Sequence, residues 1–158
     1  MKKLMEIMAE ELSSAFEKAG YRPEYGKVTV SNRPDLCEFQ CNGAMAGAKE
    51  YKKAPFMIAE DVVAYLKDSP VFSKAEVVKP GFINLDVKGE FLADYMNRMG
   101  GDEKFSVNQA EQPRTIIIDY GGPNVAKPLH VGHLRSAIIG ESIKRIGRYV
   151  GDRKSTRL

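Results

Sequence analysis

The sequence predicts an α+β protein built from two unlike parts. Residues 1–99 alternate short strand patterns with helical patterns, which is typical of helices packed on a small, mostly antiparallel sheet. Residues 100–113 are polar and led by glycine, as a linker is. Residues 114–151 run from a continuous apolar stretch through a Gly/Pro loop into a long helical pattern. That order is typical of the opening strand–loop–helix unit of a parallel sheet.

The N-terminal elements are predicted in the order α, β, β, α, α, β, β, α. Apolar residues from Met5 to Ala19 recur at helical spacing, and Gly20 ends the first helix. "KVTVS" and "LCEFQCN" alternate like strands on either side of the turn "NRPD". Asn42 is placed to cap an alanine-rich helix, and Pro55 to begin the next one. Two strands in "AEVVKPGFINLDV" and the closing helix "EFLADYMNRMG" complete the domain. The residues expected in its core are Leu12, Phe16, Phe39, Val62, Leu66, Ile83 and Leu85.

The C-terminal elements suggest a domain that is cut short. "RTIIID" has the apolar run of a strand buried on both faces, and a helix is expected from about Gly132 to Val150. The inner stripe expected for this helix is Ile139, Ile143, Ile146 and Val150, and its outward cations are Lys144, Arg145 and Arg148. "GDRKSTRL" offers no further strand, so residues 152–158 are expected to be a non-native or disordered tail.

Composition indicates a globular protein of the cytoplasm. The 158 residues are 43% hydrophobic and 28% charged, and no apolar run approaches the length of a membrane span. Acidic residues interrupt the apolar pattern at the N-terminus, which a signal peptide would not show. Cys37 and Cys41 would lie roughly 13 Å apart along a strand. That separation excludes a disulfide between them and favours two buried thiols.

The charge changes sign along the chain. Residues 1–112 carry 15 Lys and Arg against 18 Asp and Glu, a net charge of −3. Residues 113–158 carry 9 against 3, a net charge of +6. The first part is therefore no general polyanion binder, and two units are expected to meet near residue 112.

The chain has two histidines, and both lie at the predicted start of the last helix. His130 and His133 are three residues apart, so their rings can share one side of the first turn, where backbone N–H groups favour an anion. Gly132 leaves room for a flat ring such as adenine, and Lys127 adds a positive charge. The pattern favours binding of a nucleoside triphosphate, with no metal cluster or nucleophile apparent. The alternative is that the histidines only cap the helix or fill space.

Longer strings around these histidines resemble a known family. "DYGGPNVAKPLHVGHLRSAIIGESIKRIGRYVG" resembles the signature region of class I aminoacyl-tRNA synthetases, and specifically of arginyl-tRNA synthetases. "EFQCNGAMAGAKEYKKAPFMIAEDVV" and "VVKPGFINLDV" are similar to the additional domain that precedes catalysis in that family. The resemblance implies a tRNA-binding domain over residues 1–99. It also implies the first βα unit of a Rossmann-like catalytic domain, truncated here, over residues 114–151.

The resemblance assigns the nucleotide chemistry to four residues. His130, Gly132 and His133 would bind ATP, with Lys127 near the α-phosphate. The two histidines and the lysine would act in catalysis, stabilising the pentacovalent α-phosphorus while the carboxylate of arginine attacks it.

It assigns the other two substrates to residues elsewhere. Asp119 would meet the guanidinium of arginine, and Asn124 would hold its amino end. The residues expected to contact the D-loop at the tRNA elbow are Phe39, Gln40 and Asn42. Lys49, Lys52 and Lys53 could meet RNA phosphates or form a solvated face. One departure concerns Gly121 and Gly122, because many relatives have a serine before the Pro-Asn pair.

The implied reaction joins arginine to tRNA(Arg) through an arginyl-adenylate. ATP, with Mg²⁺, is expected as a substrate, with no tightly bound cofactor, no metal site in the protein and no membrane partner. The parent enzyme is expected to be monomeric, and the fragment alone inactive. Two alternatives stay open: a small HxGH nucleotidyltransferase, against which the roughly 112 preceding residues argue, and a non-catalytic RNA-binding module.

Overall fold

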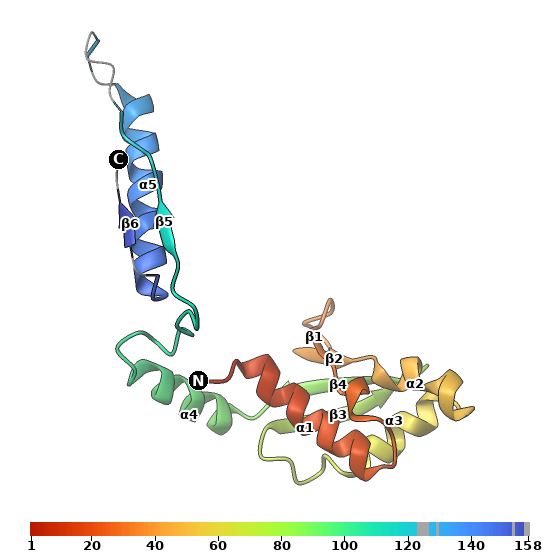
Figure 1. Ribbon diagram of the computed structural model, residues 1–158. Coiled ribbons are helices and arrows are strands. Elements are labelled where there is room, and N and C mark those ends of the chain that lie inside the picture. Colours follow the sequence, from red (N-terminus) through yellow and green to blue (C-terminus); the bar gives the residue numbers. More distant parts are fainter. Residues whose placement is uncertain (123–126, 129, 153, 157–158) are drawn as a thin grey trace. The chain divides into compact units, whose positions relative to one another are not determined.

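The computed structural model describes residues 1–122, 127–128, 130–152 and 154–156 (Figure 1). Backbone contacts divide the chain into two units, Lys2–Met99 and Gly100–Leu158, with Met1 grouped with the second.

The N-terminal unit is a four-stranded antiparallel sheet with helices, and its element order is the predicted one. Its strands lie in the order β1-β2-β4-β3, so β3 and β1 are the edges. A single turn of 3-10 helix at Pro23–Tyr25, which the pattern did not predict, connects the first helix to the sheet. The other elements are α1 (Leu4–Lys18), β1 (Val28–Val30), β2 (Phe39–Cys41), α2 (Gly43–Tyr51), α3 (Pro55–Ala64), β3 (Phe72–Val78), β4 (Phe82–Val87) and α4 (Gly89–Gly100).

The core of this unit lies between the sheet and the helices α1 and α3, which contact each other and the strands. Its largest fully buried side chains include Met8, Phe16 and Ile58. Burying each such side chain contributes roughly 1.5–3 kcal/mol, so this layer dominates the stability of the unit. The expected core residues found buried are Leu12, Phe16, Val62, Leu66, Ile83 and Leu85. Phe39 is partly buried and packs against this cluster.

The two cysteines are free and buried, as predicted. Cys41 is fully buried, and this burial raises the pKa of its thiol to about 11. A thiol that stays protonated at neutral pH behaves as a small apolar side chain, so Cys41 contributes packing and no chemistry.

The C-terminal unit contains one long helix and two short strands among the described residues. Strand β5 (Thr115–Ile117) pairs in parallel with β6 (Lys154–Thr156), and α5 spans Val131–Tyr149. The expectation that "GDRKSTRL" supplies no strand is therefore wrong for Lys154–Thr156. Extended backbone beside β5 satisfies that strand's hydrogen-bonding edge, which is a stronger constraint than the polar side chains of the segment.

Burial in this unit differs from the prediction in three places. Ile117 is 62% exposed, so β5 is not buried on both faces. The isoleucine stripe of α5 faces solvent, with exposed fractions of 50% for Ile139, 51% for Ile143 and 63% for Ile146. Lys144, expected to point outward, has a side chain only 17% exposed. The two differences on α5 share a reason, which is that the helix turns Gly140, and not its isoleucines, towards Tyr120 after β5.

No helix in the described part of the chain is long and apolar enough to cross a bilayer.

Candidate functional site

The histidines of the HxGH sequence cap the N-terminus of α5. His130 is the N-cap residue, with extended backbone, and its Nδ1 accepts the N–H of Gly132 at 3.1 Å. The Nδ1 of His133 accepts the N–H of His130 at 3.2 Å, and the two ring centroids are 4.0 Å apart. These bonds satisfy backbone donors that a helix start otherwise leaves unpaired. The capping role that the sequence left open is therefore present.

Capping also fixes which nitrogen of each ring carries a proton. A ring nitrogen that accepts a backbone N–H bears no hydrogen, so the neutral ring holds its proton on Nε2. Each histidine thus presents an Nε2–H donor while its Nδ1 is occupied by the backbone. Both donors stand at the positive end of the α5 dipole. Capping and anion binding are compatible here, because they use different nitrogens.

The absence of a side chain at Gly132 lets the His130 ring keep its capping hydrogen bond. A Cβ at position 132 would lie 2.9 Å from Cε1 and 3.1 Å from Nδ1 of His130. A side chain there would push the imidazole off its capping position. The glycine therefore protects the orientation of His130, in addition to leaving open space beside the backbone.

The loop between β5 and α5 carries the remaining candidates. Asp119 lies two residues beyond the end of β5 and is exposed, and Lys127 is exposed as well. Asn124 lies outside the described residues. Gly121 has φ +74°, a left-handed conformation that favours glycine, whereas a Cβ at Gly122 would meet nothing within 4 Å. A serine before the Pro-Asn pair would therefore fit at position 122 of this chain.

Between Asp119 and Gly121, Tyr120 anchors the loop to α5. Its hydroxyl donates to Glu141 Oε2 at 2.5 Å, and Glu141 also pairs with Lys144 and, at 3.0 Å, with Arg145. Hydrogen bonds from Lys144, Tyr120 and Arg145 lower the pKa of Glu141 to about 2. Glu141 is therefore an anion throughout the neutral range. Neither Tyr120 nor Glu141 was singled out by the sequence, because their meeting depends on how α5 packs.

A second group of polar side chains lies on the sheet face opposite the core of the N-terminal unit. Gln40 is paired with Asn84 in the register of β2 and β4, and its Nε2 donates to Asn84 Oδ1 at 2.9 Å. Asn84 is only 5% exposed, so its amide depends on this partner. Asn84 was missed, although the alternation of "FINLDV" places it opposite Ile83 and Leu85 and on the same face as Phe82.

The three residues expected to contact tRNA do not share one surface. Phe39 and Gln40 are adjacent in β2 and so point to opposite faces, with Phe39 packed on the core. Asn42 is exposed at the N-cap position of α2, where its side chain makes no capping hydrogen bond. The predicted N-cap position of Asn42 is therefore confirmed, without the side-chain hydrogen bond that usually accompanies it. Phe39 and Gln40 are both partly buried, on opposite faces of β2, and Asn42 is exposed.

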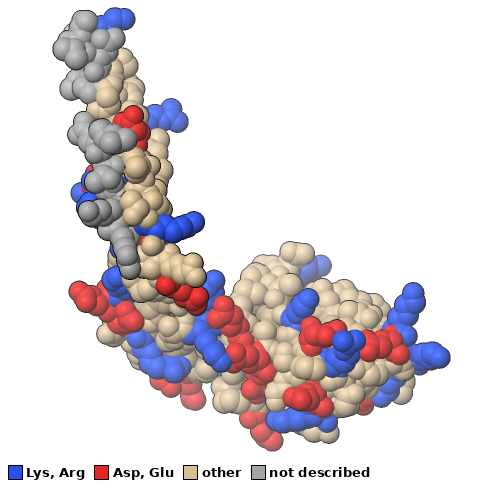
Figure 2. Space-filling model, in the orientation of Figure 1, with Lys and Arg blue, Asp and Glu red and all other residues tan. Residues whose placement is uncertain are grey.

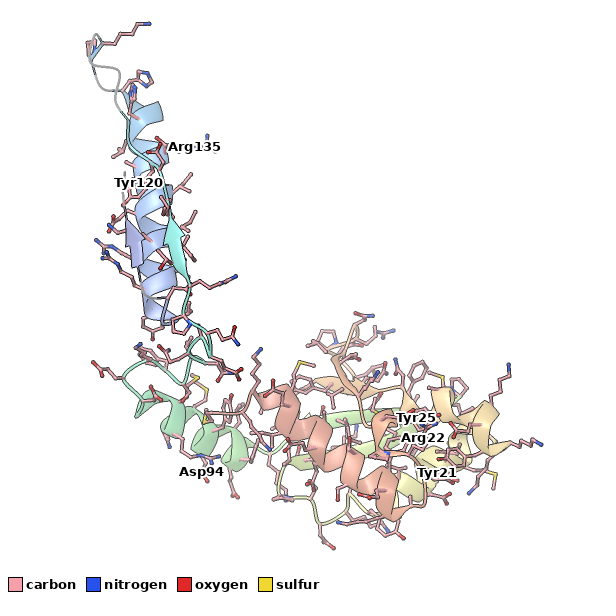
Figure 3. The ribbon with its side chains drawn as sticks, viewed as in Figure 1. Tyr21, Arg22, Tyr25, Asp94, Tyr120 and Arg135 are labelled. Carbon is pink, nitrogen blue, oxygen red and sulfur yellow. The ribbon has the colours of Figure 1, made fainter. Side chains whose placement is uncertain are left out.

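The nearby lysines also differ from one another. Lys53 Nζ lies 2.5 Å from Asp61 Oδ2 and 2.9 Å from the hydroxyl of Tyr21 (Figure 3 labels Tyr21). Its hydrogen bond with Asp61 is the main cause that raises the pKa of Lys53 to about 12. Lys53 therefore joins Asp61 on α3 to Tyr21, three residues beyond α1, whereas Lys49 and Lys52 are exposed. On the face shown in Figure 2, cations and acids are interspersed over the N-terminal unit.

The parts of a class I tRNA synthetase are recognisable in this arrangement, in which an HxGH turn begins the helix that follows a strand. Residues 97–157 match the family model described as "tRNA synthetases class I (R), catalytic domain". Residues 2–87 match the model "Arginyl tRNA synthetase N terminal domain". The chain belongs to the arginyl-tRNA synthetase family.

Relatives of known name agree with this assignment. The chain is 61% identical over 152 residues to the arginine–tRNA ligase of Agathobacter rectalis, covering 96% of this chain and 26% of the relative. It is 58% identical over 151 residues to that of Alkaliphilus oremlandii, covering 93% and 26%. The chain therefore spans about a quarter of the length of these relatives.

Solved structures agree at the level of the fold. The arginyl-tRNA synthetase of Plasmodium falciparum superposes with a TM-score of 0.63 at 22% identity, over 99% of this chain and 31% of that one. The Thermus thermophilus enzyme gives a TM-score of 0.52 at 23% identity, over 98% and 25%.

Proposed function

We propose that this chain is the N-terminal part of an arginine–tRNA ligase, which activates arginine with ATP and transfers it to tRNA(Arg). Family membership supports the class of enzyme. The observation that carries the chemistry is the pair of Nδ1 caps at the start of α5, because they leave the Nε2–H group of each ring to donate to a ligand.

In the first step the carboxylate oxygen of arginine attacks the α-phosphorus of ATP, and pyrophosphate leaves. Negative charge builds on the α-phosphate oxygens as the phosphorus becomes five-coordinate. The Nε2–H groups of His130 and His133 donate to those oxygens, and the ammonium of Lys127 adds positive charge. Adenine lies against the backbone at Gly132. Mg²⁺ accompanies ATP as its counter-ion, and the protein holds no tightly bound cofactor.

Arginine is bound by the loop after β5. A carboxylate and a guanidinium match in a planar pair of parallel hydrogen bonds, which assigns the side chain of arginine to Asp119. Exposure of Asp119 just beyond the end of β5 supports this role, since open α/β sheets bind ligands at the carboxyl ends of their strands. Asn124, outside the described residues, is assigned to the amino end of the substrate.

The N-terminal unit contacts the D-loop of tRNA through its polar sheet face. Gln40 and Asn42 offer amides that hydrogen-bond an unpaired base, and Asn84 holds Gln40 in place. The net charge of −3 over residues 1–112, and the interspersed charges on the face shown in Figure 2, fit recognition by shape and hydrogen bonding better than bulk attraction to phosphate. Phe39 contributes by packing against the core from the other face of β2.

The remaining proposals concern the whole protein. The ligase is cytoplasmic and monomeric, with no membrane partner. The 158-residue chain alone is inactive, because the isoleucines of α5 and Ile117 of β5 lack the packing that holds a catalytic site rigid.

The test uses a ligase chimera, in which this chain replaces the segment that it matches in the Agathobacter rectalis enzyme. ATP–pyrophosphate exchange is measured with saturating tRNA(Arg). Exchange that requires arginine, and is not supported by lysine, is expected. Exchange without arginine but with a phosphorylated cofactor precursor would instead indicate the nucleotidyltransferase alternative. tRNA binding without any exchange would indicate an RNA-binding module.

A further inference from the structure

The ring of Tyr120 occupies the space of a missing side chain on α5. A Cβ built at Gly140 would lie 2.1 Å from Cγ and 2.5 Å from Cβ of Tyr120. Gly140 is the one residue of α5 that is buried among those described, and it is buried by this ring. Tyr120 therefore lies directly against the helix backbone (Figure 3).

The hydroxyl of Tyr120 is held by a charged pair on the same helix. Glu141 accepts it at 2.5 Å, and Lys144 both pairs with Glu141 and places its Nζ 5.8 Å from the centre of the tyrosine ring. Lys144 and Glu141 have side chains 17% and 35% exposed, so this contact is shielded from solvent on the helix side. The contact of the ring with Gly140 fixes how closely Tyr120 approaches α5, and the charge-assisted hydrogen bond to Glu141 fixes the orientation of its side chain.

This anchor lies between the two proposed substrate sites. Tyr120 directly follows Asp119, and Gly140 comes seven residues after His133, roughly 10 Å along the axis of α5 at 1.5 Å per residue. The two histidines are oriented by their own capping bonds and do not depend on Tyr120. Asp119 has no hydrogen bond or ion pair in the described part of the chain, so the backbone of Tyr120 is what places it.

We propose that Tyr120 is a positioning residue, which through Gly140 and Glu141 sets the location of Asp119 relative to the histidine turn and so controls the use of arginine. The inference rests on the proposed function. It gives a specific consequence: loosening the anchor impairs arginine binding and leaves ATP binding largely intact.

The experiment measures KM for arginine and for ATP separately in the ligase chimera. Tyr120→Phe keeps the ring on Gly140 and removes the donor, so KM for arginine is expected to rise roughly three- to tenfold while KM for ATP stays within about twofold. Gly140→Ala is expected to raise KM for arginine further, because its methyl group displaces the ring. Gly147→Ala is the matched control on the same helix, since its Cβ would meet only Asp152 Oδ2 at 3.9 Å.

Two variants of the acceptor separate positioning from simple support of the fold. Glu141→Gln keeps an oxygen for the tyrosine hydroxyl and is expected to restore most of the arginine affinity that Glu141→Ala loses. Equal rises in both KM values, or lower thermal stability with unchanged KM for arginine, would overturn the proposal. Absence of arginine-dependent exchange in the unaltered chimera would instead reject the proposed function, and the positioning role with it.

Discussion

The side-chain amide of Gln40 donates to that of Asn84 at 2.9 Å, joining β2 to β4 on the sheet face that lies opposite the core. An amide pair of this kind uses one donor of Gln40 and one acceptor of Asn84. Gln40 keeps its oxygen and a second N–H, with Asn42 two residues along the chain. The pair thus orients amide groups that suit the edge of an unpaired base.

Asn84→Ala is expected to weaken tRNA(Arg) binding roughly three- to tenfold, as one or two net hydrogen bonds are lost when Gln40 is released. Affinity is measured by filter binding with the ligase chimera at fixed salt. Glu76→Gln, which alters the residue opposite Asn84 on β3, is the matched control. Unchanged tRNA affinity with a lowered melting temperature would show that the amide pair serves the sheet alone.

Phe39→Ala is expected to lower the stability of the fold and to leave tRNA affinity nearly unchanged. Because the ring packs against the core from the other face of β2, its loss should lower the free energy of unfolding by about 2 kcal/mol, less than for a fully buried phenylalanine. Denaturant titration of the chimera measures this. tRNA affinity of the folded protein should change less than twofold. A tenfold loss of tRNA affinity at unchanged stability would return Phe39 to the stacking role that the resemblance implies.

Residues 2–99 are expected to fold without the rest of the chain, since their core is formed within that range. Limited proteolysis of the 158-residue chain should cut first between Gly100 and Pro113, and the fragment ending near Met99 should keep a cooperative melting transition. Early cuts within β3 or β4 would contradict this boundary.

Acid should weaken the hydrogen-bonded cluster of Asp61, Lys53 and Tyr21. Hydrogen bonds from Lys53 and then Tyr21 lower the pKa of Asp61 below its ordinary value. A carboxylate with a depressed folded-state pKa stabilises the fold above its unfolded pKa of about 3.9, and this contribution is lost as pH falls through the folded value. Asp61→Asn should therefore flatten the decline in melting temperature below about pH 4.

Glu60→Gln, a change at the exposed neighbour of Asp61, provides the control for this titration.

The stabilisation from the same cluster is also lost at high pH, because the pKa of Lys53 is raised to about 12. Its contribution is complete below the unfolded lysine value of about 10.4 and disappears as pH rises through 12. Parallel melting curves for wild type and Asp61→Asn across both ranges would show that the cluster is too well solvated to matter.

The sequence predicted what depends on local pattern. The order of the N-terminal elements and the burial of Leu12, Phe16 and Ile83 follow from periodicity and turn residues, and both are found. The histidine caps were only the alternative that the spacing left open, and they form because an N-cap residue and the residue three positions later meet within one turn.

What the sequence could not predict depends on packing partners. Ile139 and Ile143 have the spacing of a buried stripe, yet periodicity does not reveal which face of α5 meets Tyr120. Asn84 and Gln40 are 44 residues apart, and their contact requires the register of β2 on β4. The sequence does not distinguish Lys53 from its neighbour Lys52, because the ion pair of Lys53 with Asp61 depends on the position of α3.

The most direct test of the account replaces His130 by each of two amides in the ligase chimera. Asparagine places its oxygen near the position of Nδ1, so His130→Asn keeps the helix cap and removes the Nε2–H donor. Glutamine places its N–H near the position of Nε2, so His130→Gln keeps the donor and loses the cap. Arginine-dependent ATP–pyrophosphate exchange and melting temperature are measured for both.

His130→Asn is expected to melt like the unaltered chimera but to exchange roughly 10²–10³-fold more slowly, the usual cost of removing a donor to a developing oxyanion. His130→Gln should melt at a lower temperature and keep much more of the exchange rate. Full exchange by His130→Asn, together with loss of exchange in proportion to stability in His130→Gln, would mean that the histidine only caps α5, and would contradict the proposed role in ATP chemistry.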